Sequence, residues 1–503
     1  MKSILKFSSI FFLAHMLLWS PLQSQVLLGS AISGEGSTDA SGTAIALSSD
    51  GNILAIASER ALSAGFTTGH VRVFSFQDSM WIQKGMNIDG QAGGDRAGSS
   101  LDISADGTRV AIGSNGHNVN RGHVRVFEWQ DSSWVQIGQD IDGASGGSRA
   151  GSSLSLSSDG NRLAMGAPWN DDVASNSGQV RVFDWDGTNW IQIGTDIEGQ
   201  NAGDQAGASV VLSSDGNRLA IGAIDSDSAN IQDVGEVIVF EWTGTDWTQL
   251  GPSIYGRNAN DVFGSSIRLS NNGNRLAASA KPTSRRIGGY IRIFEWDGTN
   301  WNQVGADILA ETNGDGFGEA IDLSEDGNRI AGGAPENSQN ISGAGHVRIF
   351  DWDGGQWMQV GVDIEGSSTR ADLGSALAFS ADGNILAVGA PFQNGASGET
   401  LVYELDFTST PIDPYISSFH AFEKLFPNPS TGIVHLQINL NTSAEVQLSL
   451  YNLFGQVMYS EKKQGLYGKN QLEMNIKNLP AGIYEVFVTV KNISISRKLE
   501  IRK

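Results

Sequence analysis

The chain has 503 residues, of which 63 are glycine and none is cysteine, and its formal charge is −22. Many glycines beside only 17% charged residues predict short strands joined by tight turns, and therefore an all-β protein of more than one domain. The acidic balance excludes a nucleic-acid-binding protein, because phosphate backbones are bound through clustered Lys and Arg. The lack of cysteine excludes thiol catalysis and thiolate metal sites.

The N-terminal segment is typical of a secretory signal peptide. Residues 1–24 carry Lys2 and Lys6, then the apolar run FSSIFFLAHMLLW, and we expect cleavage after Ser24. The run is too short to cross a bilayer, and no later stretch reaches about 18 apolar residues, so we expect no transmembrane segment in the mature chain. Residues 26–36, VLLGSAISGEG, then form a strand-like segment with no neighbouring strand to pair with.

One unit is repeated seven times after this segment. Successive copies start 53 to 57 residues apart, which indicates a repeated supersecondary unit. Each copy contains four strand candidates, which read SLSLS, RLAMGAP, QVRVFDW and NWIQIG in the third copy. The turns SSDGN and WDGTNW between them favour tight hairpins, because glycine tolerates positive φ. The copies start near Gly42, Gly98, Gly151, Gly207, Gly264, Gly318 and Gly374.

Seven four-stranded units predict a seven-bladed β-propeller over residues 25–405. An open solenoid is the alternative, but it needs polar end caps, and the sequence shows none. The seventh copy ends after its third strand, VYEL. Aligning QVLLGSAISGEG with WIQIGTDIEGQN places Val26 on Ile191 and Ile32 on Ile197. We therefore predict that the N-terminal strand supplies the missing fourth strand of the last blade and leaves no open edge.

Aromatic residues flank the hairpin between the third and fourth strands. We expect these rings to pack between neighbouring sheets, because large rings bury much area, and contact with a sugar is the alternative. The pairs are Phe76/Trp81, Trp129/Trp134, Trp185/Trp190, Trp242/Trp247, Trp296/Trp301 and Trp352/Trp357.

Segments such as FGSSIRLSNNGNRLAASA and FGEAIDLSEDGNRIAGGAP carry Phe-Gly and Gly-Ala-Pro signatures. They resemble the FG-GAP repeats that form integrin α-subunit propellers, and the resemblance covers all seven copies. The calcium loop usual in that family, Asp-x-Asp-x-Asp-Gly, is missing, and a short turn with one carboxylate cannot supply the roughly six to eight oxygen ligands of calcium. We therefore expect no cofactor, with calcium the disfavoured alternative. The turn aspartates, expected to bond nearby backbone N–H groups, are Asp50, Asp106, Asp159, Asp215, Asp326 and Asp382.

The loops of a propeller fall on two faces. The SSDGN and WDGTNW turns share one face and are nearly uniform among the copies, whereas the second-to-third-strand loops and the unit connections share the other face and differ. We expect a ligand on the variable face, since insertions in repeats commonly map to a binding face, with solvated loop residues as the alternative. The candidate residues are Trp169, Asn170, Asp171, Asp172, Asp225, Asp227, Arg285, Arg286 and Phe392.

His70, His123 and His346 occupy the same GHV position in three copies. Equivalent positions on separate blades are too far apart to ligate one metal, so we expect surface histidines at strand starts and no metal site. No nucleophile elbow, zinc motif or phosphate loop is present, and we assign no catalytic residue. Two carboxylates on the acidic loop face would nevertheless suffice for glycosidase chemistry.

The composition changes from residue 425. Residues 406–424 are a predicted linker, and residues 425–503 carry 9 basic and 5 acidic residues, against 24 and 50 before them. Alternating strands and turns predict a small Ig-like β-sandwich. The segments LFPNPSTGIVHLQI, NLPAGIYEVFVTV and SRKLEIRK closely resemble the C-terminal sorting domain of the Bacteroidetes type IX (Por) secretion system. The resemblance implies that residues 425–503 engage that secretion machinery and that the protein is released or attached to the cell surface.

The function expected from the sequence is non-enzymatic binding of a glycan or a protein through the variable loop face. An extracellular enzyme acting on polysaccharide, with carboxylates on that face, is one alternative. A purely structural surface protein is another.

Overall fold

The structure is a computed structural model. It describes residues 24–63, 65–228, 231–284, 287–406, 419–440, 444–452, 457–465, 468–490 and 493–502. The predicted signal peptide up to residue 23 and residues 407–418 of the predicted linker lie outside the described residues. The chain divides into two compact units, and the ring unit spans Gln23–Phe407 while the C-terminal unit contains Thr408–Lys503. None of the helices in the described ranges is long and apolar enough to cross a membrane.

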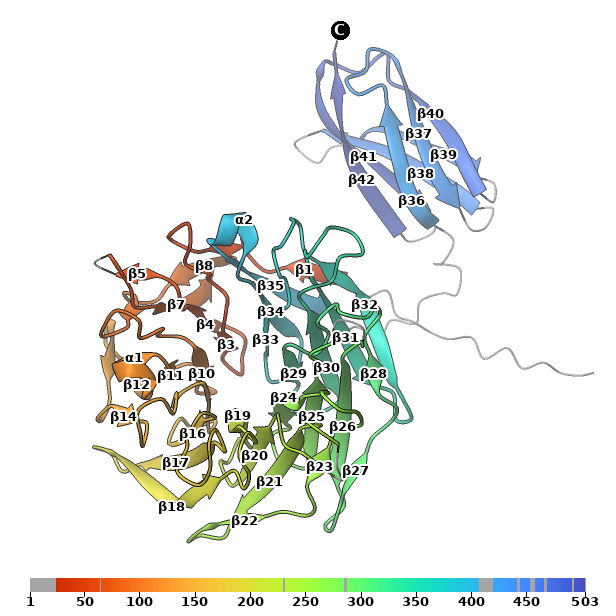
Figure 1. The fold of residues 1–503 in the computed structure, drawn as a ribbon. Coiled ribbons are helices and arrows are strands. Elements are labelled where there is room, and N and C mark those ends of the chain that lie inside the picture. Colours follow the sequence, from red (N-terminus) through yellow and green to blue (C-terminus); the bar gives the residue numbers. More distant parts are fainter. Residues whose placement is uncertain are drawn as a thin grey trace, which may run out of the picture. The chain divides into compact units, whose positions relative to one another are not determined.

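The described part of the ring unit contains seven antiparallel sheets built on the same plan of four successively paired strands. Figure 1 shows the sheets arranged around a common axis, with each first strand nearest to it. The first strands are β3 (Ile45–Leu47), β10 (Ser100–Ile103), β15 (Ser153–Leu156), β19 (Ala206–Leu212), β24 (Phe263–Leu269), β29 (Ile321–Leu323) and β33 (Ala376–Phe379).

The second strands are the most uniform elements of the ring unit. Each has six residues, the last five of which are buried, as expected where both faces of a sheet are covered by neighbours. They are β4 (Ile53–Ser58), β11 (Arg109–Ser114), β16 (Arg162–Ala167), β20 (Arg218–Ala223), β25 (Arg275–Ala280), β30 (Arg329–Ala334) and β34 (Ile385–Ala390).

The third strands pair with a second strand on one side and a fourth strand on the other. Arginines on several of them reach the preceding sheet, and Arg125 Nη2, for example, donates to Asp89 O at 2.8 Å. The third strands are β7 (His70–Gln77), β12 (His123–Gln130), β17 (Gln179–Trp185), β21 (Glu236–Trp242), β26 (Tyr290–Trp296), β31 (His346–Trp352) and β35 (Glu399–Asp406).

The fourth strands form the outer edge of the sheets in Figure 1. In the third and sixth sheets the fourth strand is continuous, and its pairing with the third strand shifts register at Arg181 and Arg348. In the other sheets the fourth strand is divided into two short pieces. Six fourth strands are β8 (Met80–Gln83), β13 (Ser133–Gln136), β18 (Trp190–Glu198), β22 (Trp247–Gln249), β27 (Trp301–Gln303) and β32 (Trp357–Glu365). The second pieces are β9 (Ile88–Asp89), β14 (Ile141–Asp142), β23 (Ile254–Tyr255) and β28 (Ile308–Leu309).

The fourth strand of the last sheet comes from the N-terminal segment. β1 (Ser24–Leu27) and β2 (Ile32–Ser33) both pair antiparallel with β35, with Val26 opposite Glu404 and Ile32 opposite Thr400. The same register joins β17 and β18 in the third sheet, where Ile191 lies opposite Asp184 and Ile197 opposite Val180. The predicted pairing of the N-terminal strand with the seventh repeat is therefore confirmed, together with its alignment.

The predicted packing of aromatic rings between sheets is also confirmed. Trp190 is 2% exposed, and its indole N–H donates to Ile137 O of the preceding sheet at 3.3 Å. Trp134 makes the same bond to Lys84 O at 2.8 Å. Trp81 of the first sheet donates to Leu28 O at 2.9 Å. The N-terminal segment therefore accepts the same tryptophan hydrogen bond that Lys84 O and Ile137 O accept.

The turn aspartates act as predicted. Asp159 Oδ1 accepts the Ser157 hydroxyl at 2.6 Å and the backbone N–H of Asn161 at 3.0 Å. Asn272 takes this place in the fifth sheet and accepts the backbone N–H of Asn274 at 2.9 Å. These hydrogen bonds account for the Ser-x-Asp-Gly-Asn pattern as turn chemistry.

The C-terminal unit consists of two antiparallel sheets that enclose one apolar core. Core residues come from both sheets, for example Leu436 and Met474 from one and Leu448 and Val486 from the other, and all four are fully buried. One sheet contains β36 (Phe419–Phe426), β37 (Ile433–Leu440) and β40 (Gly468–Asn475). The other contains β39 (Val457–Gly465), β38 (Ala444–Asn452), β41 (Gly482–Val490) and β42 (Ile493–Ile501).

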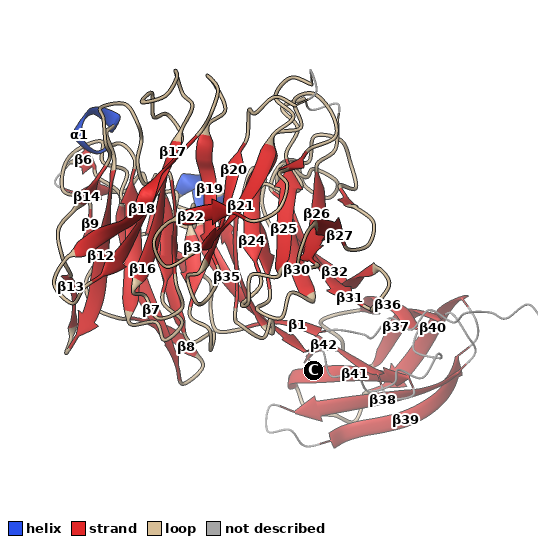
Figure 2. Cartoon of the chain, turned by 90° about the horizontal axis from the view of Figure 1, so that it is seen from below, coloured by secondary structure: helices blue, strands red, loops and turns tan. Residues whose placement is uncertain are grey.

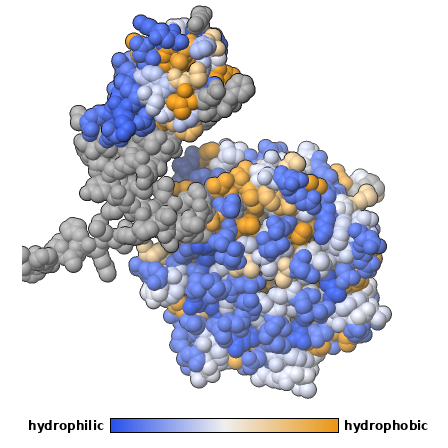
Figure 3. Space-filling view, turned by 180° about the vertical axis from the view of Figure 1, so that it is seen from behind, coloured by the Kyte–Doolittle hydropathy of each residue, from blue (hydrophilic) through white to orange (hydrophobic). Residues whose placement is uncertain are grey.

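The two faces of the ring unit carry different connections, and Figure 2 shows the ring unit edge-on. The loop face carries the second-to-third-strand loops, including α1 (His117–Asn120), α2 (Gln393–Ala396) and the β5 (Leu62–Ser63) and β6 (Phe66–Thr67) pair, together with the connections between sheets. The hairpin face carries the SSDGN and WDGTNW turns. The side of the ring unit seen in Figure 3 is mostly hydrophilic, with hydrophobic residues gathered in one sector.

Candidate functional site

Two variable segments meet on the loop face in six of the seven repeats. The connection that opens a repeat accepts a backbone hydrogen bond from the residues that follow its second strand. Trp169 N–H donates to Ser148 O at 3.3 Å, and Glu336 N–H donates to Asp315 O at 2.9 Å. Side chains about twenty residues apart are therefore brought side by side at equivalent positions around the loop face.

Buried aspartates shape these connections. Asp95 is 1% exposed and accepts the backbone N–H of Ala92 at 2.7 Å. Asp204 and Asp261 repeat the arrangement with the N–H groups of Asn201 and Asn258, at 2.8 and 2.9 Å. Sequence reasoning missed these residues, although an aspartate stands three positions before the first glycine in five of the seven copies.

The next residue along each connection has a left-handed backbone, even though most of these residues are not glycine. Such conformations are sparsely populated and cluster at functional sites, and here they present a different side chain in each repeat. The residues are Ala40, Arg96, Arg149, Gln205, Val262 and Asp372, with φ between 52° and 56°.

Two of the predicted aromatic residues occupy equivalent positions after second strands, and each lies against an arginine. Trp169 is 40% exposed, and the Arg149 guanidinium lies 4.4 Å from its ring centroid. Phe392 is half-buried, with the Arg60 guanidinium 5.1 Å from its ring centroid. Both rings form cation–π pairs at the loop face.

The polar residues after Trp169 hold their own loop together. Asn170 is fully buried, and its side chain accepts the backbone N–H of Asp172 at 2.8 Å and donates to the Asp172 carboxylate at 3.0 Å. Asp171 accepts the backbone N–H of Asn176 at 2.7 Å. The structure therefore places Asn170 inside the loop, whereas Asp171 and Asp172 are exposed.

Asp225 and Asp227 lie together in a polar cavity of about 700 Å³ between the third and fourth repeats. We call this the acidic cavity. Gln205 donates a hydrogen bond to the Asp225 carboxylate, and Asp227 accepts the backbone N–H of Asp233 at 2.8 Å. The lining residues are Asn176, Asn201, Ala202, Gly203, Asp204, Gln205, Asp225, Asp227, Gln232 and Asp233.

The acidic cavity perturbs one of its carboxyls. Burial raises the pKa of Asp225, and the neighbouring charges of Asp233 and Asp227 raise it further. The hydrogen bond from Gln205 acts in the opposite direction. Asp225 thus holds a proton to higher pH than an ordinary aspartate.

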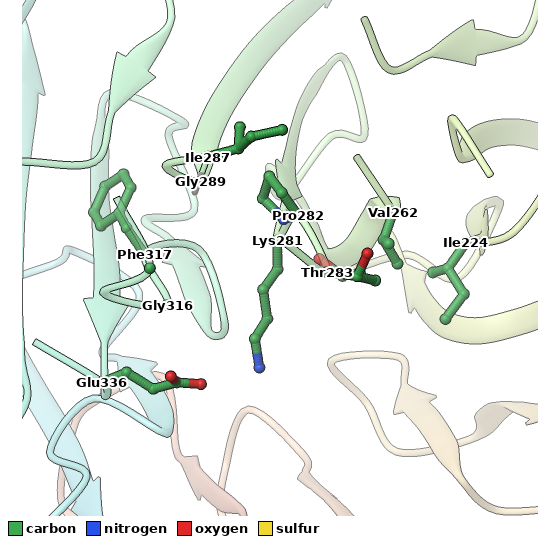
Figure 4. A pocket seen from close by; sticks show the side chains of 12 residues that line it. Ile224, Val262, Lys281, Pro282, Thr283, Ile287, Gly289, Gly316, Phe317 and Glu336 are labelled. Carbon is green, nitrogen blue, oxygen red and sulfur yellow. The ribbon is translucent and has the colours of Figure 1, made fainter. Parts of the chain in front are cut away.

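A second cavity, of about 370 Å³, lies between the fourth, fifth and sixth repeats and is drawn in Figure 4. Its walls are mainly apolar, with Ile224, Val262 and Phe317 among them. Lys281 extends across the cavity, and the Glu336 carboxylate points toward the side where the Lys281 amine ends. We call this the lysine cavity, and sequence reasoning did not select its residues.

Burial lowers the pKa of Lys281, whereas the charges of Glu336 and Asp372 act to raise it. Lys281 also forms an ion pair with Glu319. The predicted site residues Arg285 and Arg286 belong to the loop after Lys281, but they lie outside the described residues.

The expectation that the GHV histidines lie at the surface is wrong. His70 is 5% exposed, and His123 and His346 are 0% exposed. Each of these histidines begins a third strand and is therefore flanked by a second strand and a fourth strand. His123, for example, pairs with Ser114 on one side and with Asp142 on the other. Burial lowers the pKa of His123 to about 4, so its ring is neutral at pH 7.

The comparison with protein families places the C-terminal unit. Residues 424–502 match the model of the secretion system C-terminal sorting domain. This sorting domain indicates export by the type IX secretion system, to the cell surface or into the medium. The same match supports the predicted interaction of the C-terminal unit with the type IX secretion machinery. The match covers the C-terminal part of the chain alone.

No curated protein matches the chain. A putative 6-phosphogluconolactonase from Bacteroides uniformis is similar in structure, at 14% identity and a TM-score of 0.45, over 65% of this chain and 86% of that chain. The β-propeller domain of the Trilobed protease from Pyrococcus furiosus has 12% identity and a TM-score of 0.44, over 74% and 98%. The periplasmic gluconolactonase of Pseudomonas aeruginosa has 15% identity and a TM-score of 0.43, over 65% and 88%.

Proposed function

We propose that the protein is an exported seven-bladed β-propeller, closed by its N-terminal strand, that binds a glycan through the loop face without transforming it. The Ig-like C-terminal unit serves export, and the mature propeller is released or held at the cell surface. The acidic cavity is the observation that carries the binding proposal.

The chemistry of the acidic cavity fits a polyhydroxylated ligand. Carboxylates accept hydrogen bonds, and amides both donate and accept them, so the two together match hydroxyl groups that also do both. The cavity combines Asp225 and Asp227 with the amides of Asn176, Asn201 and Gln232. At about 700 Å³ it has the size of an ordinary small-ligand site.

The exposed aromatic ring of Trp169 adds a second kind of contact on the same face. Its loop continues to Asn176, which lines the acidic cavity. A flat ring is suited to the apolar face of a sugar, and the Arg149 guanidinium fixes one side of it. We therefore place Trp169 at the rim of the proposed binding site.

The test is a glycan array with the full mature chain, followed by titration of the glycans that bind. The double variant Asp225→Asn/Asp227→Asn removes two carboxylates while keeping the shape, and it should weaken binding at least about tenfold, as loss of two charge-assisted hydrogen bonds implies. Asp131→Asn is the matched control, because Asp131 is exposed in a turn on the hairpin face. Equal binding by the double variant and the control would refute the site.

A polysaccharide-acting enzyme is the second candidate, and the raised pKa of Asp225 favours it. A carboxyl that keeps its proton can act as a general acid, and Asp227 supplies the second carboxyl group that glycosidase chemistry needs. Release of reducing ends from a polysaccharide panel, abolished in Asp225→Asn, would establish this function in place of simple binding.

A further inference from the structure

A group of metal-ligating side chains lies on the loop face of the second sheet, apart from both cavities. It consists of Asp95 from the connection before β10, His117 from α1 and His123 from the start of β12. Each offers one ligand atom, and these atoms all lie within 4.8 Å of one another. The Nδ1 atom of His117 lies 3.0 Å from Oδ1 of Asp95.

His123 has no partner of its own in this group. Its side chain is 0% exposed, and neither ring nitrogen has a hydrogen-bond partner within the part of the chain that the structure describes. The Asp140 carboxylate lies 3.7 Å from Nδ1, which is beyond hydrogen-bond distance. Buried polar atoms are nearly always paired, so a ring left unpaired beside a histidine and a carboxylate points to a missing ligand.

We propose that Asp95, His117 and His123 bind one divalent transition-metal ion of the zinc type. Two imidazole nitrogens and a carboxylate oxygen are the ligands that such an ion prefers, and three protein ligands leave a fourth position open. Two atoms that bind one tetrahedral zinc ion at about 2.0–2.2 Å are themselves about 3.4 Å apart, so Asp95 and His117, at 3.0 Å, need to separate only slightly to admit the ion. This site is independent of the proposed glycan site.

Binding requires one ring to move. The His117 and His123 rings are stacked, with centroids 4.0 Å apart and planes 14° apart. The lone pairs of parallel rings do not converge, so His117 must tilt toward the ion while His123 stays fixed in the sheet. His117 can do so because its side chain is 20% exposed, and the ion enters from that side.

Asp140 supports the site from outside. Its carboxylate accepts hydrogen bonds from Gln136 at 2.7 Å and from Gln91 at 3.0 Å, which fix it near the His123 ring. From 3.7 Å, a shift of less than about 1 Å would let this carboxylate accept a hydrogen bond from Nδ1 of His123, the contact by which carboxylates orient ligating imidazoles. The positive charge of Arg125 lies near His123 and disfavours a bound cation. The negative charges of Asp95 and Asp140 offset this repulsion.

The sixth sheet offers a matched comparison. Glu311, His346 and Asp363 also bring three ligand atoms together, and both ring nitrogens of the buried His346 lack a partner among the described residues. This group has one imidazole in place of two, and Arg348 Nη1 lies 3.9 Å from the Glu311 carboxylate. We therefore assign the ion to the second sheet alone.

The experiment uses the mature full-length chain, stripped with a chelator and titrated with Zn²⁺ by calorimetry. The wild type should bind one ion per chain, and His117→Gln should weaken binding at least about tenfold. His346→Gln should bind as the wild type does. Because His117 is partly exposed, its substitution should leave the thermal melt of the metal-free chain unchanged.

Co²⁺ gives a second readout. The wild type and His346→Gln should develop the visible absorption of a low-symmetry Co²⁺ site, and His117→Gln should not. The proposal is overturned if the wild type binds no Zn²⁺ in a one-to-one ratio, if His117→Gln binds it with unchanged affinity, or if His346→Gln is the variant that loses it.

Discussion

Single residues carry much of the regularity of the ring unit, and the turn aspartates show how. Burial raises the pKa of Asp159, but hydrogen bonds from Ser157 and Asn161 outweigh burial and hold the pKa below the ordinary value of 3.8. The corresponding carboxyls in the other SSDGN-type turns are lowered for the same reasons. A lowered carboxyl pKa stabilises the fold above the unfolded-state pKa, and this stability is lost as the pH falls through the folded-state pKa.

The first prediction concerns acid unfolding. Replacing all six turn aspartates by Asn should reduce the fall in melting temperature between pH 7 and pH 3, since Asn keeps neutral hydrogen bonds, as Asn272 does in the fifth sheet. Differential scanning calorimetry at the two pH values measures the fall. An equal fall in the wild type and the variant would contradict the prediction.

The sequence also misled at this scale, for a physical reason. Asn170 has the polar character of a loop residue, yet it is fully buried, because a loop that folds over itself needs internal hydrogen-bond partners. His123 follows a turn glycine, yet it lies in the middle of a sheet. The residue type and its neighbours along the chain do not reveal contacts made by distant segments.

At the scale of elements, five of the seven sheets are joined to the next sheet by an arginine that begins the second strand. Arg162 pairs with the Asp184 carboxylate of its own sheet at 2.6 and 2.9 Å and donates to Gly216 O in the next turn at 3.0 Å. Arg109, Arg218, Arg275 and Arg329 repeat these contacts. Ile53 and Ile385 take this position in the first and seventh sheets.

The second prediction tests this contact. Arg162→Ala should lower the free energy of unfolding by about 1–2 kcal/mol, because charge-assisted hydrogen bonds to two sheets are lost. Arg162→Lys should recover only part of it, since an ammonium lacks the planar fork. Urea unfolding measures both, with the exposed Lys462→Ala as the control. If Arg162→Lys had the same free energy of unfolding as the wild type, the positive charge alone, and not the guanidinium geometry, would account for the stabilisation.

Strand order, the hairpins and the register of the N-terminal strand were predictable from the sequence, because they follow from periodicity and repetition. The two cavities were only partly predictable. Asp225 and Asp227 were selected as loop residues, whereas Lys281 and Phe317 were not, since the lysine cavity is formed by three repeats and no single repeat carries its pattern.

For the whole molecule, the decisive contact joins the two ends of the ring unit. β1 pairs with β35 of its own sheet, and the Gln25 side chain donates to Val362 O of the sixth sheet at 2.7 Å. Leu28 O, directly after β1, accepts a hydrogen bond from Trp81 of the first sheet. Without this strand, β35 would present an open edge, and unpaired strand edges invite association with other chains.

The third prediction is that deleting residues 25–36 lowers the melting temperature markedly and promotes aggregation. Ile32→Asp should act in the same direction with the strand still present, because Ile32 is 8% exposed in the core between the last and first sheets. Thermal melts and light scattering give the two readouts. Unchanged melts in both variants would show that the ring does not depend on its N-terminal strand.

The pairing of Ser24 with Asp406 has a consequence for where the chain needs to begin. Since the two ends of the ring unit are neighbours, a short peptide could join them, and a new start could be opened in any exposed SSDGN turn. Such a circularly permuted chain would form the same sheets in the same order, with the last sheet made of consecutive strands like the others. The order of the sheets around the axis therefore does not depend on which residue comes first in the ring unit.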